Sequence, residues 1–468
     1  MESSFEYNET DLKALVERFE DMLKKNGSIF FDVEELEDII DYYLDNQNAQ
    51  KSKKAIELAA AQHPGSTVFM IKKARYLVLV NKMNEALDLL DEVAKIDPTN
   101  GDIYMLKGSI YSGLKKFDEA IREYNKAIRF ANDLEEVYTN IAYEYENAGD
   151  YGNAILHLKK VLDINPDNEP VIFELSFCYE IMNQVEKGVD FLCNFLDRNP
   201  YNKVAWFNLG ICYNNLELYE KAIESYEFAI AIDESFSSAY FNLANSYANL
   251  GEYRLAIKNY KETFRYEEPQ SLTHYYIGEC YEKLNRFRDA IEHYNIALKD
   301  DAEMADAWMG LGVCYDELGE QPTAIKCMEK ALDLEDDNAE FWYIYGDLRY
   351  KMNQFQEAIS AYERVSAMDP LHPDIWADLA DSYIETGHPE KAEEVLEEGI
   401  YQQADNATLI YRMAALLFRQ GKQKNGLKML AQGLQLDFNK HQEFLEAFPE
   451  VENIKEVRDL IRSFSLNK

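Results

Sequence analysis

The sequence predicts an all-α fold of the solenoid type, a linear stack of helical hairpins, on two observations. A phrase of aromatic and small residues returns every 34 residues, as in AWFNLGICY at 205–213 and AYFNLANSY at 239–247. Within each repeat the apolar residues recur at intervals of three and four, which is the spacing of one face of an α-helix. A fixed repeat of this length predicts units that bury their apolar faces against one another.

The composition of the 468-residue chain is that of a folded protein with a large apolar core. Apolar residues make up 47%, and there are only 11 Pro and 20 Gly, which is not the composition of a disordered chain. Asp and Glu number 86 against 48 Lys and Arg, a net charge of −38. This charge repels phosphate backbones and anionic lipids, so neither nucleic acid nor a membrane is an expected partner. Without a signal-peptide pattern or a long apolar run, a cytoplasmic protein is predicted.

The repeat can be numbered by taking residue 203 as position 1. Eleven units then follow one another from 67 to 440 without an insertion or deletion. Position 8 is Gly, Ala or Ser and position 20 is Ala or Gly in every unit; Tyr occupies position 11 in eight of them, and all four tryptophans stand at position 4. The two small columns predict a close approach of two helices, with large residues at positions 4, 11 and 24 filling the space around it.

Each unit is predicted to contain a first helix, a turn, a second helix and a stop. Positions 4, 7, 8 and 11 form one face of the first helix, and positions 20, 24 and 27 form one face of the second. The turn between them carries Gly149 or Gly251 in two units, and Gly takes the left-handed conformation that ends a helix. The second helix stops before a proline, as at Asn199-Pro200, because proline disfavours helical geometry in the preceding residue.

The segments outside the eleven units are predicted to cap the stack, since a solenoid needs its terminal faces covered. Residues 1–66 are expected to hold an amphipathic helix and a degenerate unit at 36–64, in which Ala55 takes position 20. Residues 441–468 are expected to form capping helices, the last of them over 451–464.

The column pattern resembles the tetratricopeptide repeat (TPR) family, W-x2-L-G-x2-Y followed by A-x3-Y/F and A. One unit matches it at Trp206, Leu209, Gly210, Tyr213, Ala222, Tyr226 and Ala229. The resemblance implies a right-handed superhelix whose concave side is lined by the first helix of each unit. It also implies a non-enzymatic protein-interaction scaffold, and not a catalyst.

No motif in the sequence indicates catalysis, a metal or a cofactor. Four of the six cysteines occupy position 10, where repeat packing explains them as reduced core thiols. No histidine or cysteine pair has the spacing of a zinc site. Gly310 and Gly312 lie inside a predicted first helix with no strand before them, so a nucleotide loop is not expected.

The candidate site is the concave groove, because the resemblance places positions 2, 5, 6, 9, 12 and 13 there. Aromatic side chains could act as apolar anchors, amides could pair with a peptide backbone, and carboxylates could guide a partner. The alternative is that the position-5 rings pack against the next unit and that the amides are solvated. The predicted partner-binding residues are Phe173, Phe207, Asn208, Phe241, Asn242, Asn245 and Tyr275, with Glu174 and Glu279.

Carboxylates outnumber basic residues at the groove positions, which favours a basic partner segment by charge complementarity. Surface acidity that serves solubility alone is the alternative explanation. A second hypothesis is a self-assembling protein, a homo-oligomer formed through a terminal helix at 9–25 or 451–464. A co-chaperone that clamps a chaperone tail is less favoured, because the clamp needs Lys at position 5 and no unit has one.

Overall fold

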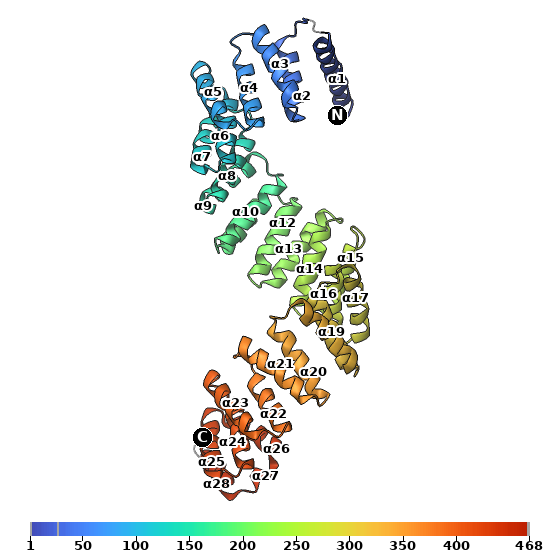
Figure 1. Ribbon diagram of the computed structural model, residues 1–468, viewed down its shortest axis with the longest axis vertical. Coiled ribbons are helices and arrows are strands. Elements are labelled where there is room, and N and C mark those ends of the chain that lie inside the picture. Colours follow the sequence, from blue (N-terminus) through green and yellow to red (C-terminus); the bar gives the residue numbers. More distant parts are fainter. Residues whose placement is uncertain (1, 26–27, 466–468) are drawn as a thin grey trace. The chain divides into compact units, whose positions relative to one another are not determined.

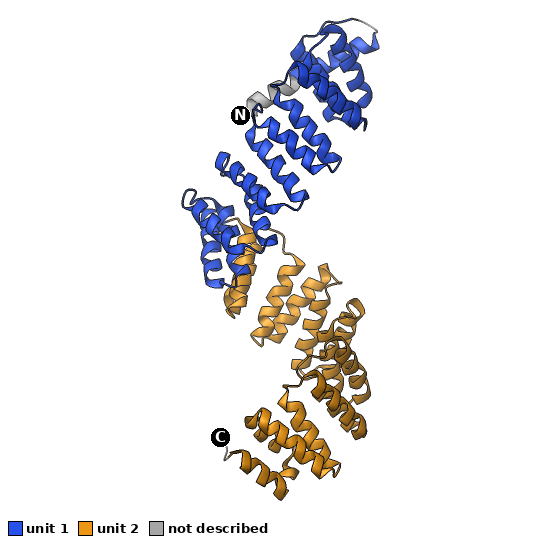
Figure 2. Ribbon diagram, turned by 90° about the vertical axis from the view of Figure 1, so that its left-hand side faces the viewer, with its two compact units in different colours: residues 1–234 blue, residues 235–468 orange. Residues whose placement is uncertain are grey.

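The computed structural model is helical throughout and describes residues 2–25 and 28–465 (Figure 1). The chain divides into two compact units, residues 1–234 and residues 235–468, which are called unit 1 and unit 2 (Figure 2). Within each unit, successive helices lie antiparallel and pack in hairpins. The all-α prediction of stacked helix pairs is confirmed.

Unit 1 contains thirteen helices within the described residues: α1 (Glu2–Lys24), α2 (Val33–Asp45), α3 (Ala49–Gln62), α4 (Thr67–Leu79), α5 (Met83–Ile96), α6 (Gly101–Gly113), α7 (Phe117–Ala127), α8 (Leu134–Asn147), α9 (Tyr151–Ile164), α10 (Glu169–Ile181), α11 (Val185–Leu196), α12 (Lys203–Asn215) and α13 (Tyr219–Ile232). Unit 2 continues the pattern with α14 (Ser237–Asn249), α15 (Tyr253–Thr263), α16 (Ser271–Lys283), α17 (Phe287–Asp300), α18 (Ala305–Glu317), α19 (Gln321–Leu334), α20 (Ala339–Lys351), α21 (Phe355–Met368), α22 (Ile375–Glu385), α23 (Pro389–Gln402), α24 (Ala407–Arg419) and α25 (Gln423–Leu436). It ends with a 3-10 turn (Phe438–Lys440), α26 (His441–Ala447), α27 (Pro449–Glu452) and α28 (Lys455–Ser465).

The small residue at position 8 makes room for the large residue at position 24 of the same hairpin. A Cβ atom added at Gly210 would stand 2.4 Å from the ring of Tyr226, and one added at Gly278 would stand 2.7 Å from the ring of Tyr294. Both rings are fully buried. The two small columns predicted a close approach of the two helices. At position 8, the small residue instead leaves space for an aromatic ring from the second helix.

The turn between the two helices has one geometry in every hairpin from α2/α3 to α24/α25. The residue at position 15 has positive φ each time, 78° at Gly251 but also 57° at Glu217. The next amide then donates back to the carbonyl of position 11, as from Leu218 N to Tyr213 O at 2.9 Å. Glycine is therefore favoured at this turn, yet the turn also forms without it.

Polar groups fix the start of the first helix. Asn202 caps α12 by accepting a hydrogen bond from Ala205 N at 2.8 Å. The indole Nε1 of Trp206 donates to Pro200 O at 2.9 Å, and Trp308, at position 4 of its own unit, bonds Ala302 O at 3.1 Å. The tryptophan column thus ties each of these first helices to the loop that precedes it.

The N-terminal hairpin lies in a different register from the one predicted. α2 begins at Val33, 34 residues before α4, so the unit runs in phase with the others and its position 20 is the buried Ser52. Ala55 therefore does not take position 20, and the degenerate unit does not start at 36. Tyr43, at position 11 of the observed register, was the signal that could have set the phase.

The C-terminal segment also departs from its prediction. The helix expected over 451–464 is interrupted between α27 and α28, at residues 453 and 454. The break lets Val451 and Val457 both enter the same apolar cluster against α24 and α25. No helix among the described residues has the length and apolar character to cross a bilayer.

Candidate protein-binding surfaces

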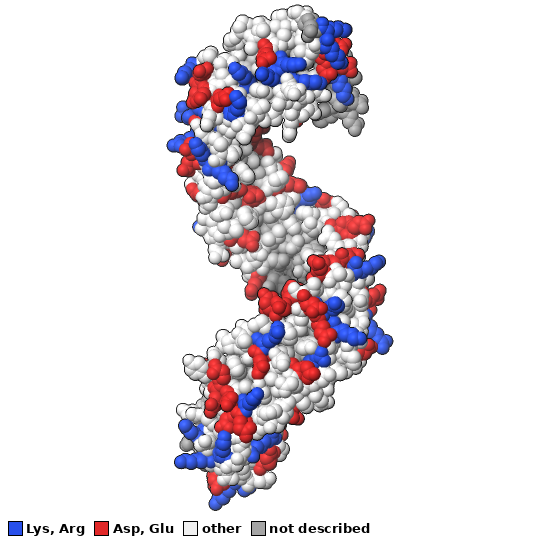
Figure 3. Space-filling model, viewed as in Figure 1, with Lys and Arg blue, Asp and Glu red and all other residues white. Residues whose placement is uncertain are grey.

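The first helices of unit 1 line a hollow of about 530 Å³ at the N-terminal part of the stack. Its basic residues already form ion pairs: Lys72 and Arg75 bind the carboxylate of Asp41, at 2.6 and 2.8 Å, and Arg75 also binds Asp45 at 3.1 Å. Figure 3 shows basic side chains gathered over the N-terminal helices of this unit. Ten lining residues stand at positions 2, 5, 6 and 9 of successive 34-residue repeats: Val68, Ile71, Lys72, Arg75, Asp102, Met105, Leu106, Ser109, Glu136 and Asn140.

Further along the same set of first helices, α8 and α10 expose large apolar side chains. Tyr143 is 56% exposed, Phe173 41% and Phe177 47%, and Ile181 is exposed as well. Phe173, Phe177 and Ile181 are spaced by four residues and so share one face of α10. These four residues are called the α8–α10 patch. The sequence prediction contained Phe173 but missed Tyr143 and Phe177, which stand at position 9, another groove position.

Carboxylates border the α8–α10 patch. Burial, together with the neighbouring carboxyl of Glu174 on α10, raises the pKa of Glu146 on α8 to about 7. The thiol of Cys178 donates to Glu146 Oε1 at 3.6 Å, which shows that the two helices adjoin here. A cation placed between the two carboxyl groups would replace the proton that Glu146 retains near neutral pH.

Two predicted site residues of unit 1 are buried. Phe207 is only 6% exposed, and its ring packs edge-on against Phe173 at 6.0 Å and against Tyr226 at 5.8 Å. Asn208 is 2% exposed and donates from Nδ2 to Val204 O at 2.9 Å. The expectation that these two side chains face a ligand does not agree with this burial. The buried ring of Phe207 packs against the exposed ring of Phe173.

The predicted residues of unit 2 lie on first helices, but most are engaged by neighbours within the unit. The ring of Phe241 contacts the rings of Tyr260 and Tyr276, at 5.5 and 5.8 Å. Asn245 Oδ1 accepts a hydrogen bond from the Tyr260 hydroxyl. Asn242, less buried than its neighbour Leu243, donates from Nδ2 to Ser238 O at 3.0 Å.

Tyrosine–carboxylate pairs are the common feature of the unit 2 face. Burial raises the pKa of Glu279, while a hydrogen bond from Tyr275 acts in the opposite direction. The hydroxyl of Tyr294 donates to Glu282 Oε2 at 2.8 Å, and Tyr343 donates to Asp378 Oδ2 at 2.9 Å. Burial also raises the pKa of Asp378 to about 6. The polar ends of these rings are therefore satisfied within the protein.

Burial makes most of the cysteine thiols unreactive. All six are free thiols, and burial raises the pKa of Cys178, Cys212, Cys280 and Cys314 to about 12, so little thiolate exists at neutral pH. Among the described residues no group of His, Cys, Asp and Glu has the arrangement of a metal site. The surfaces just described offer contact area and charge instead of a reactive group.

Four models of the tetratricopeptide repeat family match the chain. They cover more than half of it, at residues 101–134, 135–168, 204–236, 237–267, 281–339 and 349–417. No curated protein matches the sequence significantly.

Several solved structures are similar at low identity. The Cut9–Hcn1 hetero-tetramer of the APC/C is 17% identical, with 87% of this chain and 94% of that chain covered and a TM-score of 0.42. A tetratricopeptide repeat protein from Parabacteroides merdae is 15% identical over 53% of this chain and 98% of that one, with a TM-score of 0.41. YrrB, described as a TPR protein with an unusual peptide-binding site, is 17% identical over 40% and 96%, with a TM-score of 0.34. The partners in these descriptions are those of the named proteins.

Proposed function

The chain belongs to the tetratricopeptide repeat family, whose members mediate protein–protein interactions and are generally non-catalytic, and on that premise we propose that it is a scaffold for a basic, partly apolar segment of a partner protein. The segment would dock on the α8–α10 patch of unit 1. Of the residues predicted from the sequence, Phe173 and Glu174 are the central ones in this proposal.

The exposed α8–α10 patch is the observation that carries the proposal. Phe173, Phe177 and Ile181 share one exposed face of α10. Exposed apolar patches mark interaction surfaces, and aromatic residues supply much of the binding energy at such sites. Tyr143, Phe173 and Phe177 are each at least 41% exposed, and each occupies a position that the resemblance assigns to the groove. A partner that covers these three rings removes apolar surface from water, and this burial favours binding.

The charge of the partner follows from the carboxylates beside the rings. Glu146 and Glu174 adjoin, and the raised pKa of Glu146 reflects burial together with the neighbouring carboxyl of Glu174. A Lys or Arg of the partner would lower that pKa and release the proton. Binding should then tighten as the pH rises from 6 to 8, because the free protein holds the proton below about pH 7.

The remaining predicted residues have a secondary place. Phe241, Asn242, Asn245, Tyr275 and Glu279 form a second candidate surface in unit 2, which is weaker because these side chains already contact or bond other groups of the same unit. A cytoplasmic location stays part of the proposal and is supported by six cysteines without a disulfide.

The test uses the full chain and a short fluorescein-labelled peptide of Lys, Phe and Leu, followed by fluorescence anisotropy. A Phe173→Ala, Phe177→Ala variant should bind about tenfold or more weakly than the parent. The matched control is Phe228→Ala on α13, which removes a ring of similar exposure, 53%, from a second helix. A second peptide, in which Glu replaces every Lys, tests the charge preference. Equal affinities of the parent and the patch variant for the Lys peptide, or equal affinities of the parent for the Lys and Glu peptides, would contradict the proposal.

Self-assembly through a terminal helix is the second candidate, and the packing of these helices does not favour it. α1 buries Val16, Phe19 and Met22 against α2 and α3, and α28 turns Val457 onto the apolar cluster of α24 and α25. Sedimentation velocity over a range of concentrations tests this candidate. A dimer that disappears when α28 is removed would support it over the scaffold.

A further inference from the structure

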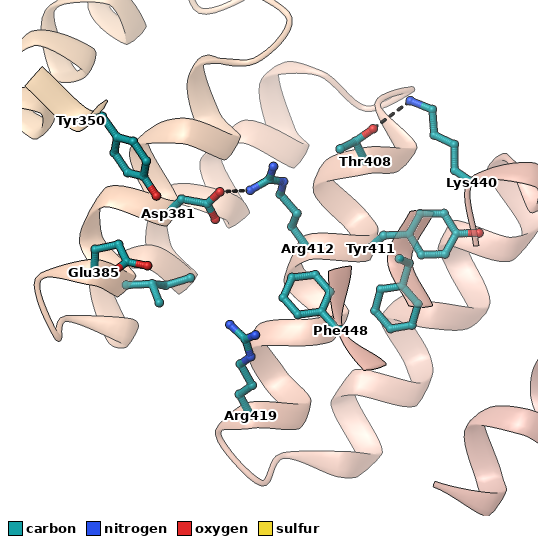
Figure 4. Close-up of a pocket in the computed structure, with 11 residues that line it drawn as sticks. Tyr350, Asp381, Glu385, Thr408, Tyr411, Arg412, Arg419, Lys440 and Phe448 are labelled. Carbon is teal, nitrogen blue, oxygen red and sulfur yellow. Dashed lines mark hydrogen bonds and ion pairs between the residues drawn. The ribbon is translucent and has the colours of Figure 1, made fainter. Parts of the chain in front are cut away.

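A second hollow, of about 360 Å³, lies in unit 2 where the repeats meet the C-terminal helices (Figure 4). α22 and α24 supply most of its lining, Tyr350 of α20 adds to it, and the segment from Lys440 to Phe448 completes it. Its volume is in the range of small binding pockets. Three basic side chains, Arg412, Arg419 and Lys440, line it together with two carboxylates, Asp381 and Glu385.

The three basic side chains differ in what they bind. Arg412 forms an ion pair with Asp381, and Arg419 Nε bonds Glu450 Oε1 at 3.1 Å. Lys440 Nζ donates to the neutral hydroxyl of Thr408 at 2.8 Å and has no carboxylate partner among the described residues. Lys440 is therefore the cation that can accept a new anion without breaking an ion pair.

Aromatic rings form the apolar side of the hollow. The ring of Phe444 lies 5.5 Å from that of Tyr411 and 5.9 Å from that of Phe448, and the guanidinium of Arg419 covers Phe448 at 4.6 Å. The Tyr411 hydroxyl donates to Asp437 O at 2.9 Å, which fixes that ring. A rigid aromatic wall of this kind suits a large apolar side chain, since little side-chain entropy is lost on binding.

One carboxylate of the lining opposes an anionic ligand. Glu385 forms no ion pair with any residue that the structure describes, and it lies on the far side of Arg412 from Lys440 (Figure 4). An anion is thus directed to the Lys440 side, where Arg412 still has guanidinium N–H groups beyond those that bind Asp381.

We propose that this hollow binds an acidic–apolar segment of a partner protein. An Asp or Glu carboxylate of the segment binds Lys440, with support from Arg412, while the adjoining large apolar side chain lies against Phe444 and Phe448. This site is independent of the α8–α10 patch and has the opposite charge preference, so either one can fail without the other.

The experiment titrates the full chain into a fluorescein-labelled Gly/Ser peptide with a central Asp-Phe pair. Two control peptides carry Asn-Phe and Asp-Gly in its place. We expect the Asp-Phe peptide to bind about tenfold more tightly than either control, and Lys440→Gln to remove that preference. Glu385→Gln should tighten binding, because it removes the opposing charge.

Lys422→Gln is the matched control, since Lys422 lies in the same unit, pairs with Glu393 at 2.6 Å and does not line the hollow. It should leave the affinity unchanged, and thermal unfolding of all variants should stay within the range of the parent. Equal binding of the Asp-Phe and Asn-Phe peptides, or equal loss in the Lys440 and Lys422 variants, would overturn the proposal.

Discussion

Units 1 and 2 use one helical repeat and yet treat its first-helix face in different ways. In unit 1, phenylalanine at positions 5 and 9 of α10 leaves rings exposed, and the nearby Glu146 has its pKa raised by burial and by the carboxyl of Glu174. In unit 2, tyrosines at positions 5 and 24 donate their hydroxyls to carboxylates of the same face, as Tyr294 does to Glu282. The difference teaches that the same helical repeat can either satisfy its polar groups internally, as the tyrosine–carboxylate pairs of unit 2 do, or leave apolar rings of a first helix exposed, as in α10 of unit 1.

The largest effect should come from the feature that the two units share. Gly210→Val in unit 1 and Gly278→Val in unit 2 each push a side chain into a buried tyrosine ring. Each should lower the free energy of unfolding by about 3 kcal/mol, measured by urea denaturation followed by circular dichroism. Gly113→Ala is the control, because nothing lies within 4 Å of its added Cβ. A small effect at Gly210 alone would show that the packing of the two units is not equivalent.

A smaller effect should separate the units. Tyr294→Phe leaves the largely buried Glu282 without its hydrogen bond, which should cost about 2 kcal/mol of unfolding free energy. Phe173→Ala in unit 1 removes an exposed ring and should cost less than about 1 kcal/mol. If the two costs in urea denaturation were equal, the contrast between an internally satisfied face and an open one would be wrong.

The pH dependence of stability sharpens the same contrast. Burial raises the pKa of Asp378 to about 6 in the folded protein, above its value in the unfolded chain. The folded state therefore holds the extra proton, and stability from this group is present at low pH and is lost as the pH rises through 6. Asp378→Asn keeps an acceptor for Tyr343 and should stabilise by about 1 kcal/mol at pH 7.5 but not at pH 4.5. Thermal unfolding at the two pH values is the measurement, and an equal shift at both would exclude this cause.

The smallest effect concerns the turn of the hairpins. Glu217 in unit 1 has φ of 57° where unit 2 has Gly251 at 78°. Glu217→Gly should stabilise by about 0.5 kcal/mol, because a side chain is strained in the left-handed region. Gly251→Ala should destabilise by about 1 kcal/mol for the same reason. Opposite signs in matched denaturation curves are expected, and equal signs would indicate that the turn does not control stability.

The fold was largely predictable because each column of the repeat records a local contact. The small residue at position 8 and the large residue at position 24 belong to one hairpin, so both residues of this contact can be found within a single 34-residue repeat. The N-terminal phase was misjudged because the small residue Ala55 was aligned with position 20, whereas that place belongs to Ser52. A single small residue carries too little information to set a register.

The candidate site was less predictable because exposure depends on the neighbouring units. Phe173 and Phe207 occupy the same column, yet one is 41% exposed and the other 6%. In the repeat of Phe207, Tyr226 at position 24 lies beside the Phe207 ring. In the repeat of Phe173, position 24 is the smaller Leu192. A rule that names groove positions cannot distinguish the two cases without the residue that covers each ring.

The tryptophan column described above has a consequence for spectroscopy. Trp206 is the one indole of unit 1, and Trp308, Trp342 and Trp376 all belong to unit 2. Each Nε1 is held by a loop carbonyl, so its emission should change when that loop opens. In a Trp206→Phe variant, tryptophan fluorescence, excited selectively over tyrosine, would report on unit 2 alone, while the circular dichroism of the helices would report on both units. The same sample could thus record whether the two halves of the chain melt together or one after the other.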